Sequence, residues 1–346
     1  MSATRIPFGE REAVIIGTGS AVPARVVTNA ELSAMLGEDI APFVSGTLGI
    51  ETRHWCGPDE STADLAEEAG RRALDMAGAS PESVDLLIIA TDTPEFVSPA
   101  TSSVVQGRLG LVNAGTFDLN AGCAGFVTAL DVAWKYIRAD ERYSRVLVIG
   151  AYAMSRYLDL HDKKTVTIFA DGAGAALVEV RRTAGTPVGV LASELFADGR
   201  FCHGMGIFAG GTRTPITASV LEQGIQNKLR FVQKYPASVN EEGWPRIVRS
   251  VLTRVGATPS EVDLWLWTQV NRSTIVQVMQ TLEQPMARAH TIMHKWGYTG
   301  SACLPMALDD AVRSGAVKDG QLIVFTGSGA GLAMGSLAMR WAMGPG

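Results

Sequence analysis

The sequence lacks the features that mark several other classes of protein. It has no basic stretch that could follow a phosphate backbone, and its net charge is -5, which excludes a general nucleic-acid binder. No segment reaches the roughly 18 uninterrupted apolar residues of a membrane span, and the first residues lack the apolar run of a signal peptide. We therefore expect a soluble, cytoplasmic protein without a nucleic-acid or membrane partner.

Cysteine is scarce, and its spacing excludes a zinc site. The four cysteines, at positions 56, 123, 202 and 303, form no CxxC pair, which indicates free thiols in a reducing compartment. A dinucleotide site is also unsupported, because the glycine turn at 17–19 lacks a third glycine and Pro23 stands where the helix should begin. We expect neither a metal nor a cofactor.

The composition is that of a compact α/β body. The chain has 346 residues, 47% of them hydrophobic and 19% charged, so it can bury a large core in two domains or one duplicated domain. Strands and helices alternate along it, which predicts twisted, mostly parallel sheets flanked by helices.

Residues 117–137 contain the first candidate for chemistry. A β-type segment ends in small residues, Cys123 stands at the turn, and a helix with an apolar stripe follows. A helix N-terminus favours thiolate over thiol, because its N–H groups and dipole attract negative charge. Cys123 is therefore either a nucleophile or, as most free cysteines are, a small buried side chain.

An internal repeat favours the nucleophile over the buried structural side chain. Three segments recur in the same order at offsets of 178, 178 and 177 residues, namely 74–86 with 252–264, 122–131 with 300–309, and 145–150 with 322–327. The chain is thus two copies of one strand–helix unit. If the copies pack about a pseudo-two-fold axis, the turn at Cys123 approaches the turn at Ser301, and a thiol opposite a hydroxyl is the asymmetry expected of a catalytic centre.

The chain resembles the thiolase superfamily and, within it, the β-ketoacyl-acyl-carrier-protein synthase III family. The likeness covers nearly the whole chain and is carried by six motifs: 17–23 (GTGSAVP), 28–32 (TNAEL), 49–54 (GIETRH), 121–126 (AGCAGF), 168–175 (IFADGAGA) and 327–336 (GSGAGLAMGS). It implies duplicated βαβαβαββ halves in a five-layer αβαβα sandwich. The half at 1–183 carries the cysteine, the other half spans 184–346, and the implied assembly is a homodimer.

The sequence departs from this family at two positions. In the family the cysteine takes an acyl group from a thioester, and a histidine and an asparagine then stabilise the enolate formed by malonyl decarboxylation. Thr268 stands at the histidine position and Tyr298 at the asparagine position. Neither hydroxyl is a base near neutral pH, so we expect no malonyl decarboxylation.

Three functions remain open. The first is an acyltransferase, like members of the family in secondary metabolism such as antibiotic biosynthesis, which moves an acyl group from a carrier protein or coenzyme A through Cys123 to an oxygen, nitrogen or sulfur nucleophile. The second keeps carbon–carbon bond formation, with a base supplied by His203 or His294. The third is a non-catalytic partner of an active homologue, which the intact turn at Cys123 argues against.

The resemblance also implies roles for other residues. Backbone N–H groups of Cys123 and Ala330 would hold the oxyanion, Tyr298 and Thr268 would contact substrate, and Phe43 and Lys163 would bind the donor's arm. Other candidates lie along the substrate's path. These are Phe169 at the floor of the acyl tunnel, Met205 and Phe208 as its lining, His203, Ser301, Asn271 and Arg272. Arg272 either contacts the phosphate of the arm or is a solvated residue at the start of a helix.

Overall fold

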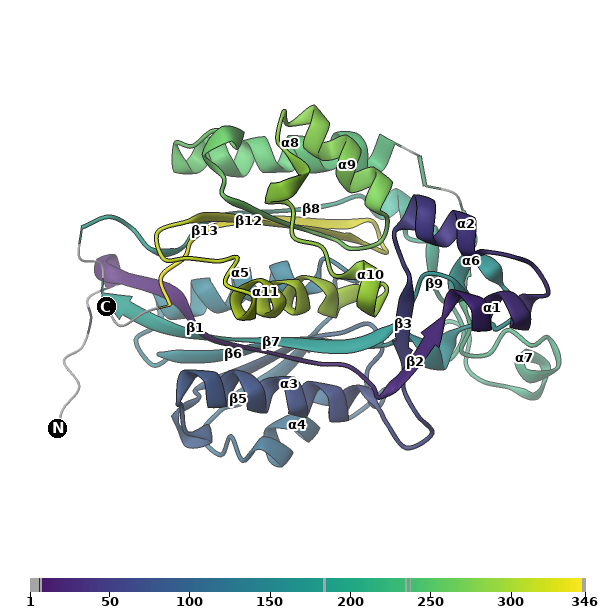
Figure 1. Cartoon of the computed structure of the whole chain (residues 1–346). Coiled ribbons are helices and arrows are strands. Elements are labelled where there is room, and N and C mark those ends of the chain that lie inside the picture. The colour runs from purple at the N-terminus through teal and green to yellow at the C-terminus, as the bar shows by residue number, and fades with distance from the viewer. Residues whose placement is uncertain (1–5, 7, 183–184, 234, 237, 344–346) are drawn as a thin grey trace.

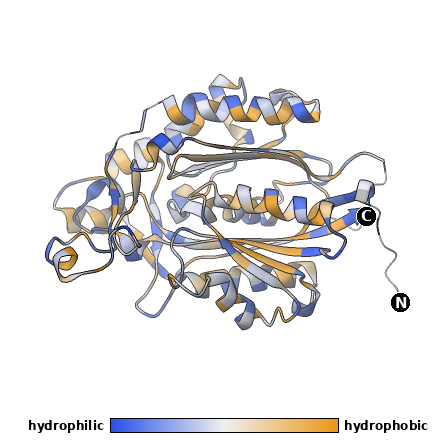
Figure 2. Ribbon diagram, turned by 180° about the vertical axis from the view of Figure 1, so that it is seen from behind, coloured by the Kyte–Doolittle hydropathy of each residue, from blue (hydrophilic) through white to orange (hydrophobic). Residues whose placement is uncertain are grey.

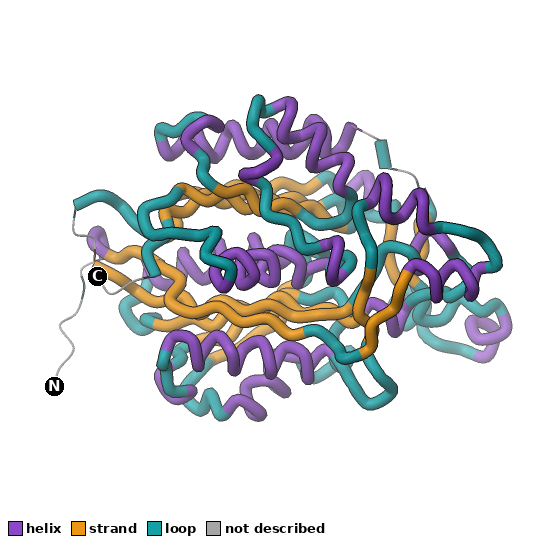
Figure 3. The backbone as a smooth tube through the Cα atoms, viewed as in Figure 1, coloured by secondary structure: helices purple, strands orange, loops and turns teal. Residues whose placement is uncertain are grey.

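The two copies of the repeat stack into five alternating layers of helices and sheets (Figures 1 and 3). The computed structural model describes residues 6, 8–182, 185–233, 235–236 and 238–343. The layers in Figure 1 are, from top to bottom, α8 (Ser238–Val255) with α9 (Arg272–Thr281), the sheet of the second half, α5 (Gly125–Ala139) with α11 (Cys303–Arg313), the sheet of the first half, and α3 (Thr62–Ala77) with α4 (Thr101–Leu109). This is the predicted αβαβα sandwich. The expected domain boundary at 183/184 falls on residues outside the described ones and stays a prediction.

The first sheet contains five strands in the order β1–β7–β6–β4–β5. Their bounds are β1 (Arg11–Ala21), β4 (Leu86–Ala90), β5 (Gly115–Leu119), β6 (Arg145–Ala153) and β7 (Asp171–Arg182). The strands β4, β5 and β6 are parallel, whereas β7 is antiparallel to both β6 and β1. The sheet is therefore mixed rather than mostly parallel, because no helix crosses the sheet between β6 and β7. The second part of the motif at 168–175 forms the start of β7.

The second sheet repeats this plan with four strands in the order β11–β12–β13–β8. Their bounds are β8 (Gly189–Ala197), β11 (Leu264–Trp267), β12 (Leu322–Gly329) and β13 (Ala333–Arg340). A turn of three residues joins β12 to β13, and so short a link permits only antiparallel pairing. Among the described residues, the counterpart of β5 is reduced to a single bridge between Trp265 and Ala289.

Helices cover both sheets, and two of them lie between the sheets. The outer helices are α3 (Thr62–Ala77), α4 (Thr101–Leu109), α8 (Ser238–Val255) and α9 (Arg272–Thr281), and the central pair is α5 (Gly125–Ala139) and α11 (Cys303–Arg313). The outer helices carry both hydrophilic and hydrophobic residues, as Figure 2 shows, because one face meets a sheet and the other meets water. No helix in the described part of the chain is long and apolar enough to cross a bilayer.

Smaller elements gather at one end of the sandwich (Figure 1). They are β2 (Arg25–Thr28), β3 (Thr52–Trp55), β9 (Met205–Ile207), β10 (Leu229–Phe231), α1 (Asn29–Leu36), α2 (Ala41–Phe43), α6 (Lys163–Val166), α7 (Ala218–Glu222) and α10 (Met293–Trp296). The helix α1 is capped by Thr28, whose hydroxyl accepts a hydrogen bond from the N–H of Glu31. The side chain of Asn29 is thereby left to bond the carbonyl of Ile50.

The two halves hold each other through equivalent aspartates of the central helices. Asp309 of α11 accepts hydrogen bonds from the hydroxyls of Thr18 (2.8 Å) and Ser20 (2.6 Å) in β1 of the other half. Asp131 of α5 accepts one from Ser193 in β8, which again belongs to the other half. The pair repeats the sequence offset of 178 residues, so the internal repeat is also a structural two-fold relation.

Removing one of these carboxylates should weaken the junction. We expect Asp309→Ala to lower the free energy of unfolding by about 2–4 kcal/mol, because Thr18 and Ser20 lose a charged acceptor. Asp75→Ala, at an exposed position of α3, is the matched control and should change stability by less than about 0.5 kcal/mol. Chemical denaturation of both variants measures the difference, and equal stabilities would show that the junction is held by packing alone.

Candidate active site

Cys123 lies in a tight turn between β5 and α5. The turn is shaped by Asn120, whose side-chain oxygen accepts a hydrogen bond from the N–H of Gly122 (3.1 Å), and by a φ of 52° at that glycine. The helix begins at Gly125, two residues beyond Cys123, and the cysteine is only 2% exposed. The nucleophile candidate is thus at a helix N-terminus, as predicted, but buried.

Two segments of the second half close over this turn. A Cβ at Gly125 would lie 3.6 Å from the Cβ of Ser301, so the turns at Cys123 and Ser301 do meet. Ser301 donates a hydrogen bond to the carbonyl of Ala151 (2.9 Å). The loop after β12 lies on the other side, where a Cβ at Gly122 would be 2.9 Å from the backbone nitrogen of Ala330. The structure thereby brings Cys123, Ser301 and Ala330 together.

Tyr298 faces the thiol, whereas Thr268 is engaged elsewhere. The hydroxyl of Tyr298 hydrogen-bonds with Cys123, and its ring packs 5.5 Å from the ring of Phe169. Thr268, directly after β11, accepts a hydrogen bond from the N–H of Ser328 in β12 (3.0 Å). Both residues are almost fully buried. Tyr298 can therefore donate to a group on the sulfur, while the hydroxyl oxygen of Thr268 is bound to a strand.

The surroundings of Cys123 oppose ionisation of its thiol. Burial, followed by the negative charge of Asp92, raises the pKa of Cys123 well above its usual value, and the hydrogen bond from Tyr298 only partly offsets this. The expectation that the helix N-terminus favours thiolate is therefore wrong for the resting site. Burial also raises the pKa of Tyr298, so its phenol remains a proton donor.

Thiol alkylation should reveal this protonated state. We expect iodoacetamide at pH 7 to modify the exposed Cys202 at least about tenfold faster than Cys123, because only the thiolate reacts. Modification of Cys123 should then accelerate as the pH rises toward its raised pKa. Peptide mass spectrometry after timed quenching measures both rates. Preferential labelling of Cys123 at pH 7 would show that its thiolate is already present.

None of the five histidines, all in the described part of the chain, is among the groups that most affect the pKa of Cys123. His54 bonds the carbonyl of Pro23, His290 pairs with Asp310 at 2.8 Å, His294 is half-buried beside Lys295, and His161 is exposed on a loop. His203 lines a separate cavity of about 580 Å³ with Phe208. The structure therefore does not bring His203 or His294 to the thiol.

An aspartate that the sequence interpretation did not single out lies near the nucleophile. Asp92 follows β4, and its Oδ1 atom is buried without a hydrogen-bond partner among the described residues. Its charge acts on Cys123 and on the buried Tyr152. The only signal in the sequence is a carboxylate two residues after a fully apolar strand, which is too common to have identified it.

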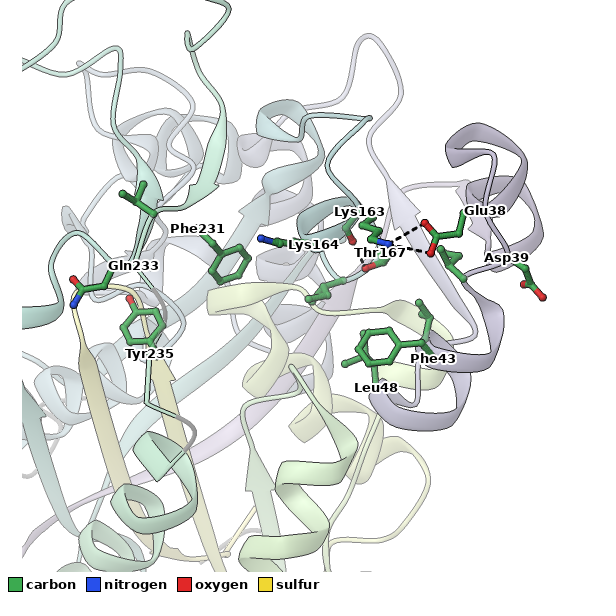
Figure 4. A pocket seen from close by; sticks show the side chains of 14 residues that line it. Glu38, Asp39, Phe43, Leu48, Lys163, Lys164, Thr167, Phe231, Gln233 and Tyr235 are labelled. Carbon is green, nitrogen blue, oxygen red and sulfur yellow. Dashed lines mark hydrogen bonds and ion pairs between the residues drawn. The ribbon is translucent and has the colours of Figure 1, made fainter.

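A cavity of about 820 Å³ lies among residues of α2, α6 and the segment after β10 (Figure 4). Phe43 and Lys163 both line it, so the two candidates for binding the donor's arm are brought together, and Lys163 pairs with Glu38 at 2.9 Å. Tyr235 also lines it, and burial raises the pKa of its phenol, with a smaller contribution from the charge of Cys123. Ile168, another lining residue, accepts a hydrogen bond from the backbone N–H of Tyr298 (3.1 Å), so the cavity wall is joined to the tyrosine that faces the thiol.

The remaining candidates lie around this cavity rather than at the thiol. Met205 pairs with Phe231, a lining residue, through the β9–β10 ladder. Asn271 caps α9 by accepting a hydrogen bond from the N–H of Ser273. The side chain of Arg272 packs against Gly49, next to the cavity wall. The described residues contain no cluster of three metal-ligating side chains.

Comparison with protein families gives two matches. Residues 117–199 match 3-Oxoacyl-[acyl-carrier-protein (ACP)] synthase III, and residues 252–341 match the C-terminal part of the same family. A curated relative is the β-ketoacyl-[acyl-carrier-protein] synthase III of Caldanaerobacter subterraneus subsp. tengcongensis, 35% identical over 94% of this chain and 97% of that protein.

Solved structures agree with these matches. The 3-oxoacyl-(acyl carrier protein) synthase III of Pseudomonas aeruginosa PAO1 is 34% identical to this chain and has a TM-score of 0.86. The match covers 96% of this chain and 100% of that one. The priming β-ketosynthase of the R1128 polyketide biosynthetic pathway is 28% identical, with a TM-score of 0.86, over 99% of this chain and 100% of that one. The similarity therefore extends over both halves.

Proposed function

This chain belongs to the 3-oxoacyl-[acyl-carrier-protein] synthase III family, and we propose that it transfers an acyl group through an acyl-Cys123 intermediate to a nucleophile other than a malonyl enolate. The observation that carries the proposal is the site around the thiol. The phenol of Tyr298, at the position where the resemblance places the asparagine, hydrogen-bonds with Cys123, and no histidine is among the groups that most affect the pKa of this thiol. Such a site can form a thioester but has lost the family's means of stabilising an enolate.

In the first half-reaction, Cys123 attacks the carbonyl carbon of a thioester donor. The backbone N–H groups of Cys123 and Ala330 are the proposed oxyanion donors, and the meeting of their two loops supports this assignment. The phenol of Tyr298 is a third donor, since its raised pKa keeps it protonated. Expulsion of the donor's thiol leaves the acyl group on Cys123.

In the second half-reaction, an alcohol, amine or thiol takes the acyl group from Cys123. The alternative is carbon–carbon bond formation, and the names of the relatives favour it. The two are separated by isolating the acylated enzyme and offering it a small alcohol, an amine, a thiol or a malonyl thioester in parallel. Movement of the acyl group from Cys123 to the alcohol, amine or thiol without release of CO2 supports heteroatom transfer. Turnover with the malonyl thioester alone supports carbon–carbon bond formation.

The donor is a carrier-protein or coenzyme A thioester whose arm occupies the cavity. The apolar wall of Phe43, Leu48 and Ile168 suits the arm's thin chain, and Lys163 with Lys164 suits its phosphate. We expect replacement of both lysines by glutamine to raise KM for the donor about 3- to 10-fold with little change in kcat. Steady-state kinetics measures this, with the exposed Lys318→Gln as control. A change in kcat with no change in KM would show that these lysines do not bind the donor.

Three further features belong to the same proposal. Transfer to a heteroatom fits a role in secondary metabolism such as antibiotic biosynthesis, in line with the polyketide pathway of one relative. The four free cysteines suit the reducing cytoplasm. A homodimer would cover β5, the half-exposed edge of the first sheet. Light scattering of the purified protein measures the mass of the assembly.

A further inference from the structure

The carboxyl of Asp92 lies close enough to Cys123 to act on its thiol, and it accepts a hydrogen bond from its own backbone N–H. Its chain neighbours are fixed, since the N–H of Thr91 bonds the carbonyl of Leu119 (3.0 Å) and the hydroxyl of Thr93 accepts a bond from the N–H of Ala153 (2.9 Å). The Oδ1 atom of Asp92 is nevertheless buried and unpartnered among the described residues. Such an atom costs free energy, so its presence calls for a function.

The register of three parallel strands carries this carboxyl toward the nucleophile. Ala90, the last residue of β4, pairs with Leu119 of β5 on one side and Gly150 of β6 on the other. Two residues further along, Asp92 stands between the start of the Cys123 turn and Tyr152. A Cβ at Gly125 would lie 3.1 Å from the Cβ of Ala90, so this side of β4 faces the start of α5. Asp92 lies just beyond the end of β4, and the effect of its charge on both Cys123 and Tyr152 agrees with this placement.

The chemistry of the site requires a base that the family's histidine does not supply here. The thiol of Cys123 is protonated at rest, and a nucleophile that later attacks the acyl group must also lose a proton. Burial raises the pKa of Asp92 to about 6, which leaves the carboxyl ionised at neutral pH and more basic than an exposed aspartate. A carboxyl with these properties is suited to general base catalysis.

We infer that Asp92 is the proton acceptor for Cys123 in both half-reactions. As Sγ bonds to the carbonyl carbon of the donor, Asp92 takes the Sγ proton. The bond from that carbon to the donor's sulfur then breaks with its electron pair, and Asp92 returns the proton to this leaving sulfur. In the second half-reaction Asp92 takes the proton of the acceptor and gives it to Sγ as the acyl–sulfur bond breaks. The inference rests on the proposed acyl-Cys123 intermediate.

The other titratable groups around this carboxyl do not compete for the role. Tyr152 of β6, Tyr157 of the following turn and the thiol of Cys123 all respond to the charge of Asp92, and all three have raised pKa values that keep them neutral. Glu95 also acts on Tyr157, but its carboxylate is bound to the N–H of Ala63 at the start of α3.

Single-turnover acylation of Cys123 by hexanoyl-N-acetylcysteamine, measured from pH 5 to 9, tests the inference. This donor carries the end of the arm that carrier proteins and coenzyme A share. We expect the wild-type rate to rise through pH 6 to a plateau. Asp92→Asn should lower the plateau at least about 100-fold and abolish this rise. Glu95→Gln, in the same loop, should keep the wild-type profile.

Two further readouts separate this role from a structural one. Loss of the negative charge should make Cys123 of Asp92→Asn more reactive toward iodoacetamide, although acylation is slower. The thermal midpoint of Asp92→Asn at pH 8 should equal or exceed that of the wild type. The folded-state pKa of Asp92 lies above its unfolded value, so the wild type loses stability as the pH rises through 6. If the Asp92→Asn protein does not fold, the same measurements are made on Asp92→Ser.

The possible outcomes distinguish the inference from the function on which it rests. Acylation of Asp92→Asn at the wild-type rate or faster would overturn the role of Asp92 alone, because the carboxylate would then only suppress the thiolate. No acylation of the wild type, by this donor or by a carrier-bound hexanoyl group, would overturn the proposed function as well.

Discussion

Replacing Cys123 with alanine is expected to abolish acyl transfer, with a loss of at least about 10⁴-fold in rate, because the acyl group would have no covalent acceptor on the enzyme. The wild-type protein, incubated with acyl thioesters, should gain the mass of one acyl group, and the variant should gain none. Intact-protein mass spectrometry measures this directly. The structure supports the assignment, since Cys123 is the cysteine enclosed by the Ser301 turn, Tyr298 and the loop carrying Ala330.

The control for this experiment is a second cysteine variant. Cys202→Ser removes an exposed thiol outside the site and should retain the adduct. An adduct that persists in Cys123→Ala would place the nucleophile elsewhere. If the wild type gains no mass from any donor but co-purifies with an active homologue, the chain acts as a non-catalytic partner, and the acyl-enzyme proposal is wrong.

The arrangement of the halves followed from the sequence because it is a local property repeated twice. Each copy of the strand–helix unit must bury the same apolar faces, so equal offsets along the chain become equivalent positions about an axis. The approach of Ser301 to Cys123 depends only on that symmetry. The mixed direction of the strands did not follow, because the pattern of apolar residues is the same in parallel and antiparallel buried strands.

The state of the thiol and its charged neighbour could not be predicted in the same way. The helix N-terminus, which is visible in the sequence, favours thiolate, whereas burial and Asp92 oppose it. Burial is a property of the packed site and not of the turn. Asp92 lies 31 positions before Cys123, and the two approach each other only through the pairing of β4 with β5. Sequence motifs identify Cys123, but tertiary packing determines its protonation.

Decarboxylation of a malonyl thioester is the other reaction for which we expect a large effect. We expect the wild-type protein to release CO2 from a malonyl thioester no faster than Cys123→Ala does, because the proposed site has hydroxyls, of Thr268 and Tyr298, in place of two nitrogen donors that would stabilise the enolate. Each missing donor costs about 10²–10³ in rate, so the two together should leave activity at least about 10⁴-fold below that of a family member that has both. Release of labelled CO2 measures the rate.

Restoring the donors tests the physical reason for this loss. Thr268→His combined with Tyr298→Asn places an imidazole and an amide at the family's positions, and we expect decarboxylation to become measurable while acylation of Cys123 persists. The hydroxyl of Thr268 now accepts from Ser328, so the histidine must also keep the end of β12 in place. Tyr298→Asn alone should give a smaller gain, because it restores one donor of the two. Cys123-dependent CO2 release by the unaltered protein would instead support carbon–carbon bond formation, with the enolate stabilised by groups other than the family's pair.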